Sequence, residues 1–135
     1  MVQFLGKGSL EMAHVLIVED NEGAREILAR FLRCVGHTFT AVSDGREAWE
    51  LLNDGWKFDL IFSDHEMNEM SGVELLQRVK ANSRTAGIPF VLMSGALTVS
   101  EGDQRGLKEV CAELDATFVE KPFFKFKELI GQLLP

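Results

Sequence analysis

Short apolar runs alternate along the chain with longer stretches whose apolar residues recur at helical spacing. The first run, residues 15–18, is aliphatic throughout and is followed by two acids, which is typical of a strand buried in a parallel sheet. Residues 22–35 then place their apolar side chains three or four positions apart, which predicts an amphipathic helix. Gly36 follows at a position where helices commonly end. The chain therefore begins as a strand followed by a helix, and the same alternation continues to its C-terminus.

The whole pattern predicts an α/β fold. Strands are expected at residues 15–18, 38–42, 58–63, 90–93 and 117–119. Helices are expected at residues 22–35, 46–53, 73–81, within 100–114 and at 123–134. Strands that alternate with helices form parallel sheets, because each right-handed crossover lays its helix on one face of the sheet. We therefore predict a doubly wound, five-stranded parallel sheet flanked by five helices.

Length and composition fit one folded domain. The chain has 135 residues, of which 46% are hydrophobic, so it can bury a core and disorder is not expected. We assign residues 14–135 to this domain. Residues 1–13 lack the apolar core of a secretory signal, and we expect a disordered leader or a cloning remnant there. No apolar run approaches the roughly 18 residues that a membrane-spanning helix needs, so no membrane contact is predicted.

The net charge and the cysteine content narrow the range of binding partners and sites that the chain could have. The net charge of -7 argues against direct binding to nucleic acid, because phosphate backbones require a basic surface. Cys34 and Cys111 fit no metal-ligand spacing and fall in predicted helices. We interpret both as reduced residues that pack inside a cytoplasmic protein.

Polar residues follow four of the five predicted strands. Glu19 and Asp20 follow the first strand, Asp64 the third, Ser94 the fourth and Lys121 the fifth. In an open α/β sheet, ligands bind beyond the carboxyl ends of the strands, so these side chains are expected at one edge. Two carboxylates about 5 Å apart repel by roughly 3 kcal/mol at an effective dielectric constant of about 20. Three such groups are tolerated if one is protonated or if a cation binds, and a hard divalent ion such as Mg2+ meets that need.

Each of these features also has an ordinary structural explanation. An acid pair after a strand can cap the next helix, and Asn21 is available for the same task. A single Asp after a strand is commonly a turn residue, Lys121 precedes a Pro at a helix boundary, and Ser94 precedes a Gly in a turn signal. The functional interpretation depends on their occurrence together, in order, at four strand ends.

Together these segments resemble the response-regulator receiver family, in the CheY-like superfamily. The resemblance covers residues 14–134, and its densest segments are 15–20, 59–64 with 70–72, 91–95 and 118–123. It implies the flavodoxin-like strand order 2-1-3-4-5. It also implies a phosphoryl-accepting protein of a two-component system. Its partners would be a sensor histidine kinase or phosphotransfer protein and an unknown downstream protein.

The resemblance implies roles for the acidic residues. Asp64 matches the aspartate that takes the phosphoryl group from the kinase. Asp20 and Asp64 match the carboxylates that bind Mg2+, together with the backbone carbonyl of Glu66, and Glu19 matches the acid that holds the metal through water. The expected cofactor is therefore Mg2+.

The resemblance also implies how the signal would be passed on. Ser94 matches the hydroxyl residue that moves to bond the phosphoryl oxygen, and Lys121 matches the lysine that pairs with the phosphate. Phe118 matches the aromatic residue that turns inward when the hydroxyl residue moves. The phosphorylated residue carries roughly -1.5 to -2 charges where the carboxylate carried one. It is expected to switch the face built by the fourth helix, the fifth strand and the fifth helix.

Several positions depart from the usual family pattern. Asn68 stands where a Pro is typical, Ser71 where an acid is common, and His65 and Glu66 are unusual neighbours of the acceptor. We interpret His65 as an exposed loop residue, and the loop after the fourth strand as extended. Glu66 places an acid near the path of an attacking water, where it could hasten or hinder hydrolysis of the phosphoryl group.

Two other functions remain open. A degenerate receiver would act as an interaction module without phosphorylation, although the set of expected site residues is complete. A phosphohydrolase is suggested by the acid-x-acid segment at residues 64–66, which superficially resembles haloacid-dehalogenase-type phosphatases. Those enzymes place the nucleophile on the first strand and usually carry a cap, for which this chain has no room. We therefore predict that the protein is not an enzyme beyond catalysing its own phosphorylation and dephosphorylation.

Overall fold

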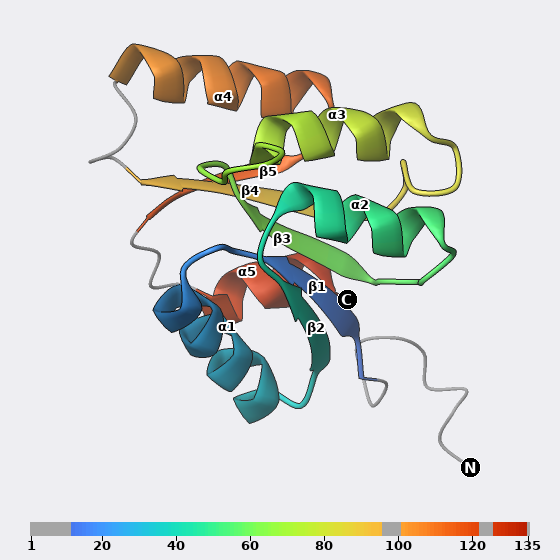
Figure 1. Cartoon of the computed structure of the whole chain (residues 1–135). Coiled ribbons are helices and arrows are strands. Elements are labelled where there is room, and N and C mark those ends of the chain that lie inside the picture. The colour runs from blue at the N-terminus through green and yellow to red at the C-terminus, as the bar shows by residue number, and fades with distance from the viewer. Residues whose placement is uncertain (1–11, 96–100, 122–125, 135) are drawn as a thin grey trace.

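A five-stranded parallel sheet forms the centre of the molecule, with strand order β2-β1-β3-β4-β5 (Figure 1). The computed structural model describes residues 12–95, 101–121 and 126–134. The strands are β1 (His14–Val18), β2 (Thr38–Val42), β3 (Leu60–Asp64), β4 (Phe90–Gly95) and β5 (Thr117–Lys121). The helices are α1 (Glu22–Cys34), α2 (Gly45–Asn53), α3 (Gly72–Ala81), α4 (Glu101–Glu113) and α5 (Phe126–Leu133). The predicted fold class and strand order are confirmed.

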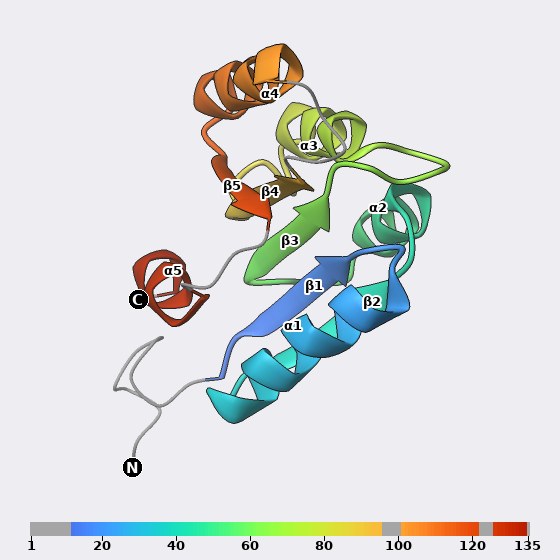
Figure 2. The ribbon, with the colours of Figure 1, turned by 90° about the vertical axis from the view of Figure 1, so that its left-hand side faces the viewer.

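Helices cover both faces of the sheet, α1 and α5 on one side and α2, α3 and α4 on the other (Figure 2). Alternate residues of β1 pack on opposite faces of the sheet, because successive side chains of a strand point to opposite faces. Leu16 and Val18 belong to the core shared with α2, α3 and α4, whereas Val15 and Ile17 belong to the core shared with α1 and α5. Burial of β1 on both faces explains why residues 15–18 are apolar without interruption.

Three strands end later than the sequence predicts, and β3 also begins two residues later than predicted, at Leu60. The last residues of these strands are predicted site residues or their neighbours. Asp64 ends β3, Ser94 lies next to the end of β4, and Lys121 ends β5. The parallel pairing continues to these positions, with Asp64 beside Met93 and Gly95 beside Lys121. Asp64, Ser94 and Lys121 therefore belong to paired strand ends, whose relative positions are set by the backbone hydrogen bonds of the sheet.

Side chains other than the predicted site acids cap the first three helices. Asn21 accepts a hydrogen bond from the backbone N–H of Ala24 at 2.8 Å and caps α1. Asp44 caps α2, and Ser71 caps α3 in a reciprocal capping box with Glu74. Helix capping thus explains Ser71, one of the departures from the family pattern.

The structure describes only part of each end of the chain. Residues 1–11 and the predicted start of the last helix at residue 123 lie outside the described residues. Ala13 is buried, donates its N–H to His37 Nδ1 at 3.0 Å and accepts from the N–H of Thr38 at 3.0 Å. The folded part therefore includes Ala13. In the part of the chain that the structure describes, no helix is both long and apolar enough to cross a membrane.

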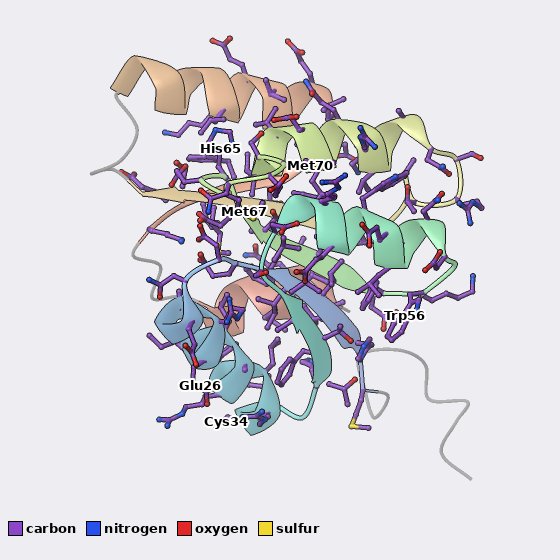
Figure 3. All side chains as sticks on the ribbon, viewed as in Figure 1. Glu26, Cys34, Trp56, His65, Met67 and Met70 are labelled. Atoms are coloured by element: carbon purple, nitrogen blue, oxygen red, sulfur yellow. The ribbon has the colours of Figure 1, made fainter. Side chains whose placement is uncertain are left out.

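The two cysteines differ in their environment. Cys111 is buried in the core on the α4 side of the sheet, as predicted. Cys34 is exposed on α1, so its predicted role as a packing residue is wrong (Figure 3). Its position near the C-terminal end of an amphipathic helix leaves it outside the buried stripe, which holds Leu28 and Leu32.

Candidate functional site

Three carboxylates gather at the carboxyl edge of the sheet. One oxygen from each of Glu19, Asp20 and Asp64 lies within 4.8 Å of the others. Glu19 and Asp64 are only 1% and 3% exposed, whereas Asp20 is exposed to solvent. The cluster is therefore two buried acids with an open side at Asp20, as predicted from the strand ends.

Strand pairing explains why these acids meet. Val18 of β1 lies beside Ser63 of β3, so the residues that follow them are neighbours at the same edge. The backbone of Glu19 is held on both sides, because its N–H donates to Val42 O at 3.0 Å and its carbonyl accepts from Arg25 Nη1 at 2.8 Å. Since Asn21 caps α1, the alternative that Glu19 and Asp20 serve as the helix cap is wrong.

Lys121 bridges the two buried acids. Its Nζ lies 2.7 Å from Glu19 Oε1 and 3.1 Å from Asp64 Oδ1. Burial by itself lowers the pKa of Lys121, but the hydrogen bond to Glu19 and the charges of Asp64 and Glu19 outweigh it, so the net pKa is raised. Lys121 is therefore held as a cation between two acids that come from different strand ends.

One ammonium does not compensate the whole cluster. Burial raises the pKa of Asp64 from 3.8 to about 7, and the charge of Glu19 adds to this effect although Lys121 opposes it. Apart from the Lys121 ammonium at 3.1 Å, the buried Oδ1 atom of Asp64 has no polar partner among the described residues. When all three acids are ionised, negative charges outnumber positive ones by two. Oxygen ligands with this excess of two negative charges fit a hard divalent cation.

Ser94 is engaged in a contact that the sequence does not predict. Its side chain is fully buried, and its hydroxyl donates to Glu66 Oε2 at 2.7 Å. The N–H of Gly95 donates to the other Glu66 oxygen at 3.3 Å. The contact follows from the adjacency of β3 and β4 in the sheet, which brings the residues after Asp64 close to the end of β4.

His65 is not the exposed loop residue that we expected. Its side chain is half-buried, and Nδ1 is buried without a hydrogen-bond partner among the described residues. Figure 3 shows His65 and Met67 at the carboxyl end of the strands, whereas Trp56 lies at the opposite end of the molecule. The backbone of His65 continues the sheet, because its N–H donates to Met93 O at 2.8 Å.

Phe118 lies on β5, three residues before Lys121, so the two side chains point to opposite faces of the sheet. It is half-buried against the core on the α4 side, and the Nζ of Lys108 from α4 is 5.8 Å from its ring centroid. A cation over an aromatic face is weakly attractive at this distance. Phe118 thus contacts the helix whose position it is expected to influence.

Comparisons with known proteins show which family and fold this chain resembles. The sequence model of the response regulator receiver domain matches residues 15–133. The two-component response regulator ORR5 of rice (Oryza sativa subsp. japonica) is 41% identical over 96 residues, which are 71% of this chain and 71% of the rice protein. Two solved structures are also similar. The chemotaxis response regulator CheY4 of Vibrio cholerae has a TM-score of 0.76 at 27% identity and covers 92% of this chain and 100% of its own. The signal receiver domain of a signal transduction histidine kinase from Syntrophus aciditrophicus has a TM-score of 0.77 at 31% identity, with 90% and 89% covered.

Proposed function

This chain belongs to the response regulator receiver family, and on that premise we propose that Asp64 accepts a phosphoryl group from a histidine kinase or a phosphotransfer protein. The observation that carries the proposal is the arrangement around Asp64. This buried carboxylate lies within 4.8 Å of two further acids and 3.1 Å from the ammonium of Lys121. Such a combination of a nucleophile, metal-ligating oxygens and a cation is suited to phosphoryl transfer.

The acid cluster is proposed to hold Mg2+. Asp20 and Asp64 would bind it through their carboxylates, Glu66 through its backbone carbonyl, and Glu19 through a water molecule. The buried Asp64 oxygen, whose only polar partner among the described residues is Lys121, and the excess of negative charge in the cluster both fit a divalent cation. When bound, Mg2+ neutralises negative charge on the phosphoryl oxygens.

The protein's own groups would carry the transfer. The ionised carboxylate of Asp64 attacks the phosphorus atom, a new O–P bond forms, and the P–N bond to the donor histidine breaks. Lys121 is already placed beside Asp64 Oδ1 and would pair with the added negative charge. Ser94 would donate its hydroxyl to a phosphoryl oxygen, provided that the hydroxyl leaves its present acceptor.

A downstream protein would recognise the phosphorylated state at the face formed by α4, β5 and α5. Phe118 on β5 packs beneath Lys108 of α4, so a change in its packing would reach that helix directly. A downstream protein would then distinguish two packings of the face. The acidic charge of the chain is consistent with a protein partner rather than nucleic acid.

One observation favours a second candidate function. Because Ser94 already donates to Glu66, the chain could be held in a single conformation and act as an interaction module without phosphorylation. Such a module would still bind metal at the acid cluster. Phosphate incorporation therefore separates the two candidates.

The test is phosphorylation by acetyl phosphate followed by intact-mass measurement. We expect a gain of about 80 Da that requires both Mg2+ and Asp64. Asp64→Asn is expected to abolish the gain, whereas Asp54→Asn, which changes an exposed acid at the end of α2, should leave it intact. Absence of the gain in the unaltered protein, sampled within seconds as well as minutes, would support the module without phosphorylation.

A further inference from the structure

The loop after β3 holds the end of β4 at two points. Both oxygens of the Glu66 carboxylate accept hydrogen bonds, one from the Ser94 hydroxyl at 2.7 Å and one from the Gly95 N–H at 3.3 Å. We propose that Glu66 is a positioning residue that retains the Ser94 hydroxyl in the unphosphorylated state and competes with the phosphoryl group for it. This inference rests on the proposed function, and it assigns to the Glu66 side chain a role separate from that of its backbone carbonyl.

Competition follows from the chemistry of the hydroxyl. Serine has a single O–H and can donate it to one acceptor at a time. While the hydrogen goes to Glu66, it is not available to an oxygen on Asp64. The bond to a carboxylate is stronger than a bond between neutral groups, and Ser94 is fully buried, so water does not replace it readily.

The position of Glu66 is set by the backbone around it. The preceding residue, His65, donates its N–H to Met93 O at 2.8 Å and accepts from the N–H of Gly72 at 3.1 Å. The loop is therefore attached both to β4 and to the start of α3. A carboxylate on a side chain of this length, projecting from that point, reaches the hydroxyl without displacing either strand.

Glu66 also acts through its charge, and the two effects must be separated. Its carboxylate adds to the negative potential at Asp64, where it contributes a small part of the raised pKa. Removing it would favour an added anion even if the bond to Ser94 were irrelevant. Glu66→Asp separates the two effects, because it retains the charge but is one methylene too short to keep the 2.7 Å contact.

The experiment measures binding of beryllofluoride, a non-covalent mimic of the aspartyl phosphoryl group, in the presence of Mg2+. Affinities are compared for the unaltered protein, Glu66→Ala, Ser94→Ala and the double variant, by titration calorimetry or fluorine NMR. Glu66→Ala is expected to bind the mimic roughly tenfold more tightly, the size of a lost charge-assisted hydrogen bond. In the Ser94→Ala background the same change should have an effect of about twofold or less, because only the charge effect remains.

The controls decide between the possible causes. Glu66→Asp should bind the mimic several-fold more tightly than the unaltered protein; an affinity equal to that of the unaltered protein would mean that charge alone acts. Glu69→Ala removes an exposed acid of the same loop, which is 3.5 Å from Arg46, and should change nothing. Thermal melting of every variant excludes unfolding as the cause.

Failure of this inference differs from failure of the proposed function. If acetyl phosphate modifies the unaltered protein but Glu66→Ala has the same effect with and without Ser94, the inference is overturned and the proposed function stands. If neither the unaltered protein nor Glu66→Ala accepts phosphate or the mimic, both are overturned. Binding to Glu66→Ala but not to the unaltered protein would support Glu66 as the group that withholds Ser94.

Discussion

Replacing Asp64 by Asn should stabilise the metal-free protein at neutral and higher pH. In the folded protein, burial and the charge of Glu19 raise the pKa of Asp64 from 3.8 to about 7. The folded state therefore binds this proton more tightly than the unfolded chain does. The contribution of Asp64 to the free energy of unfolding is greatest at low pH and is lost as the pH rises from about 4 to about 7. An Asn side chain does not titrate, so the variant escapes that loss.

The magnitude follows from the size of the shift. Each pKa unit corresponds to about 1.4 kcal/mol, so a shift of about three units gives a total of about 4 kcal/mol. Part of this change occurs below pH 5. Between pH 5 and pH 8, the free energy of unfolding of the unaltered protein should fall by about 2.5 kcal/mol relative to that of Asp64→Asn.

The assay is urea unfolding at pH 5, 6, 7 and 8 in the presence of EDTA. Asp54→Asn serves as the matched control, because it removes an exposed acid and should show no such trend. Saturating Mg2+ at pH 8 should stabilise the unaltered protein much more than Asp64→Asn, since the ion binds the ionised folded form. A stability difference between the unaltered protein and Asp64→Asn that stays constant from pH 5 to pH 8 would refute the reasoning.

Two further perturbations test the packing and the charge balance of the site. Gly72→Ala would place its Cβ against the backbone oxygen of Asp64 and 2.5 Å from Leu92 Cδ1. This substitution should lower the free energy of unfolding, measured in urea, by about 2 to 3 kcal/mol. Gly87→Ala, which has open space around its Cβ, should lower it by less than about 0.5 kcal/mol. Equal losses for the two variants would contradict the close approach at Gly72. Lys121→Met leaves two buried carboxylates without their ammonium and should cost about 2 kcal/mol at pH 8. The loss should be smaller at pH 5, where Asp64 is protonated, and a pH-independent loss would show that the ion pairs are not its cause.

Periodicity along the chain was sufficient to predict the fold class and the edge at which the site lies, whereas the strand order came from the family resemblance. Uninterrupted apolar runs such as 15–18 occur where a strand is covered on both faces, and helical spacing occurs where one face is covered. These are local consequences of burial, so a single sequence contains them. The acids at the strand ends were predictable for the same reason, because all parallel strands end at one edge and Glu19, Asp20 and Asp64 follow or end them.

Contacts between residues far apart in the chain were decided by the tertiary structure. The sharing of Lys121 between Glu19 and Asp64 depends on the order and register of β1, β3 and β5, which set distances of 2.7 and 3.1 Å. The raised pKa of Asp64 depends on how completely that edge is buried. Neither quantity has a local sequence signature.

The contact between Glu66 and Ser94 shows the same limit most clearly. The sequence places an acid two residues after Asp64 and a hydroxyl after the fourth strand, but it does not indicate that one accepts a hydrogen bond from the other. That pairing requires β3 to lie beside β4 and the His65 backbone to be held at both its N–H and its carbonyl. Residue types and their order determined which groups the site contains, whereas the packing of the strand ends determined which of those groups are already engaged with one another.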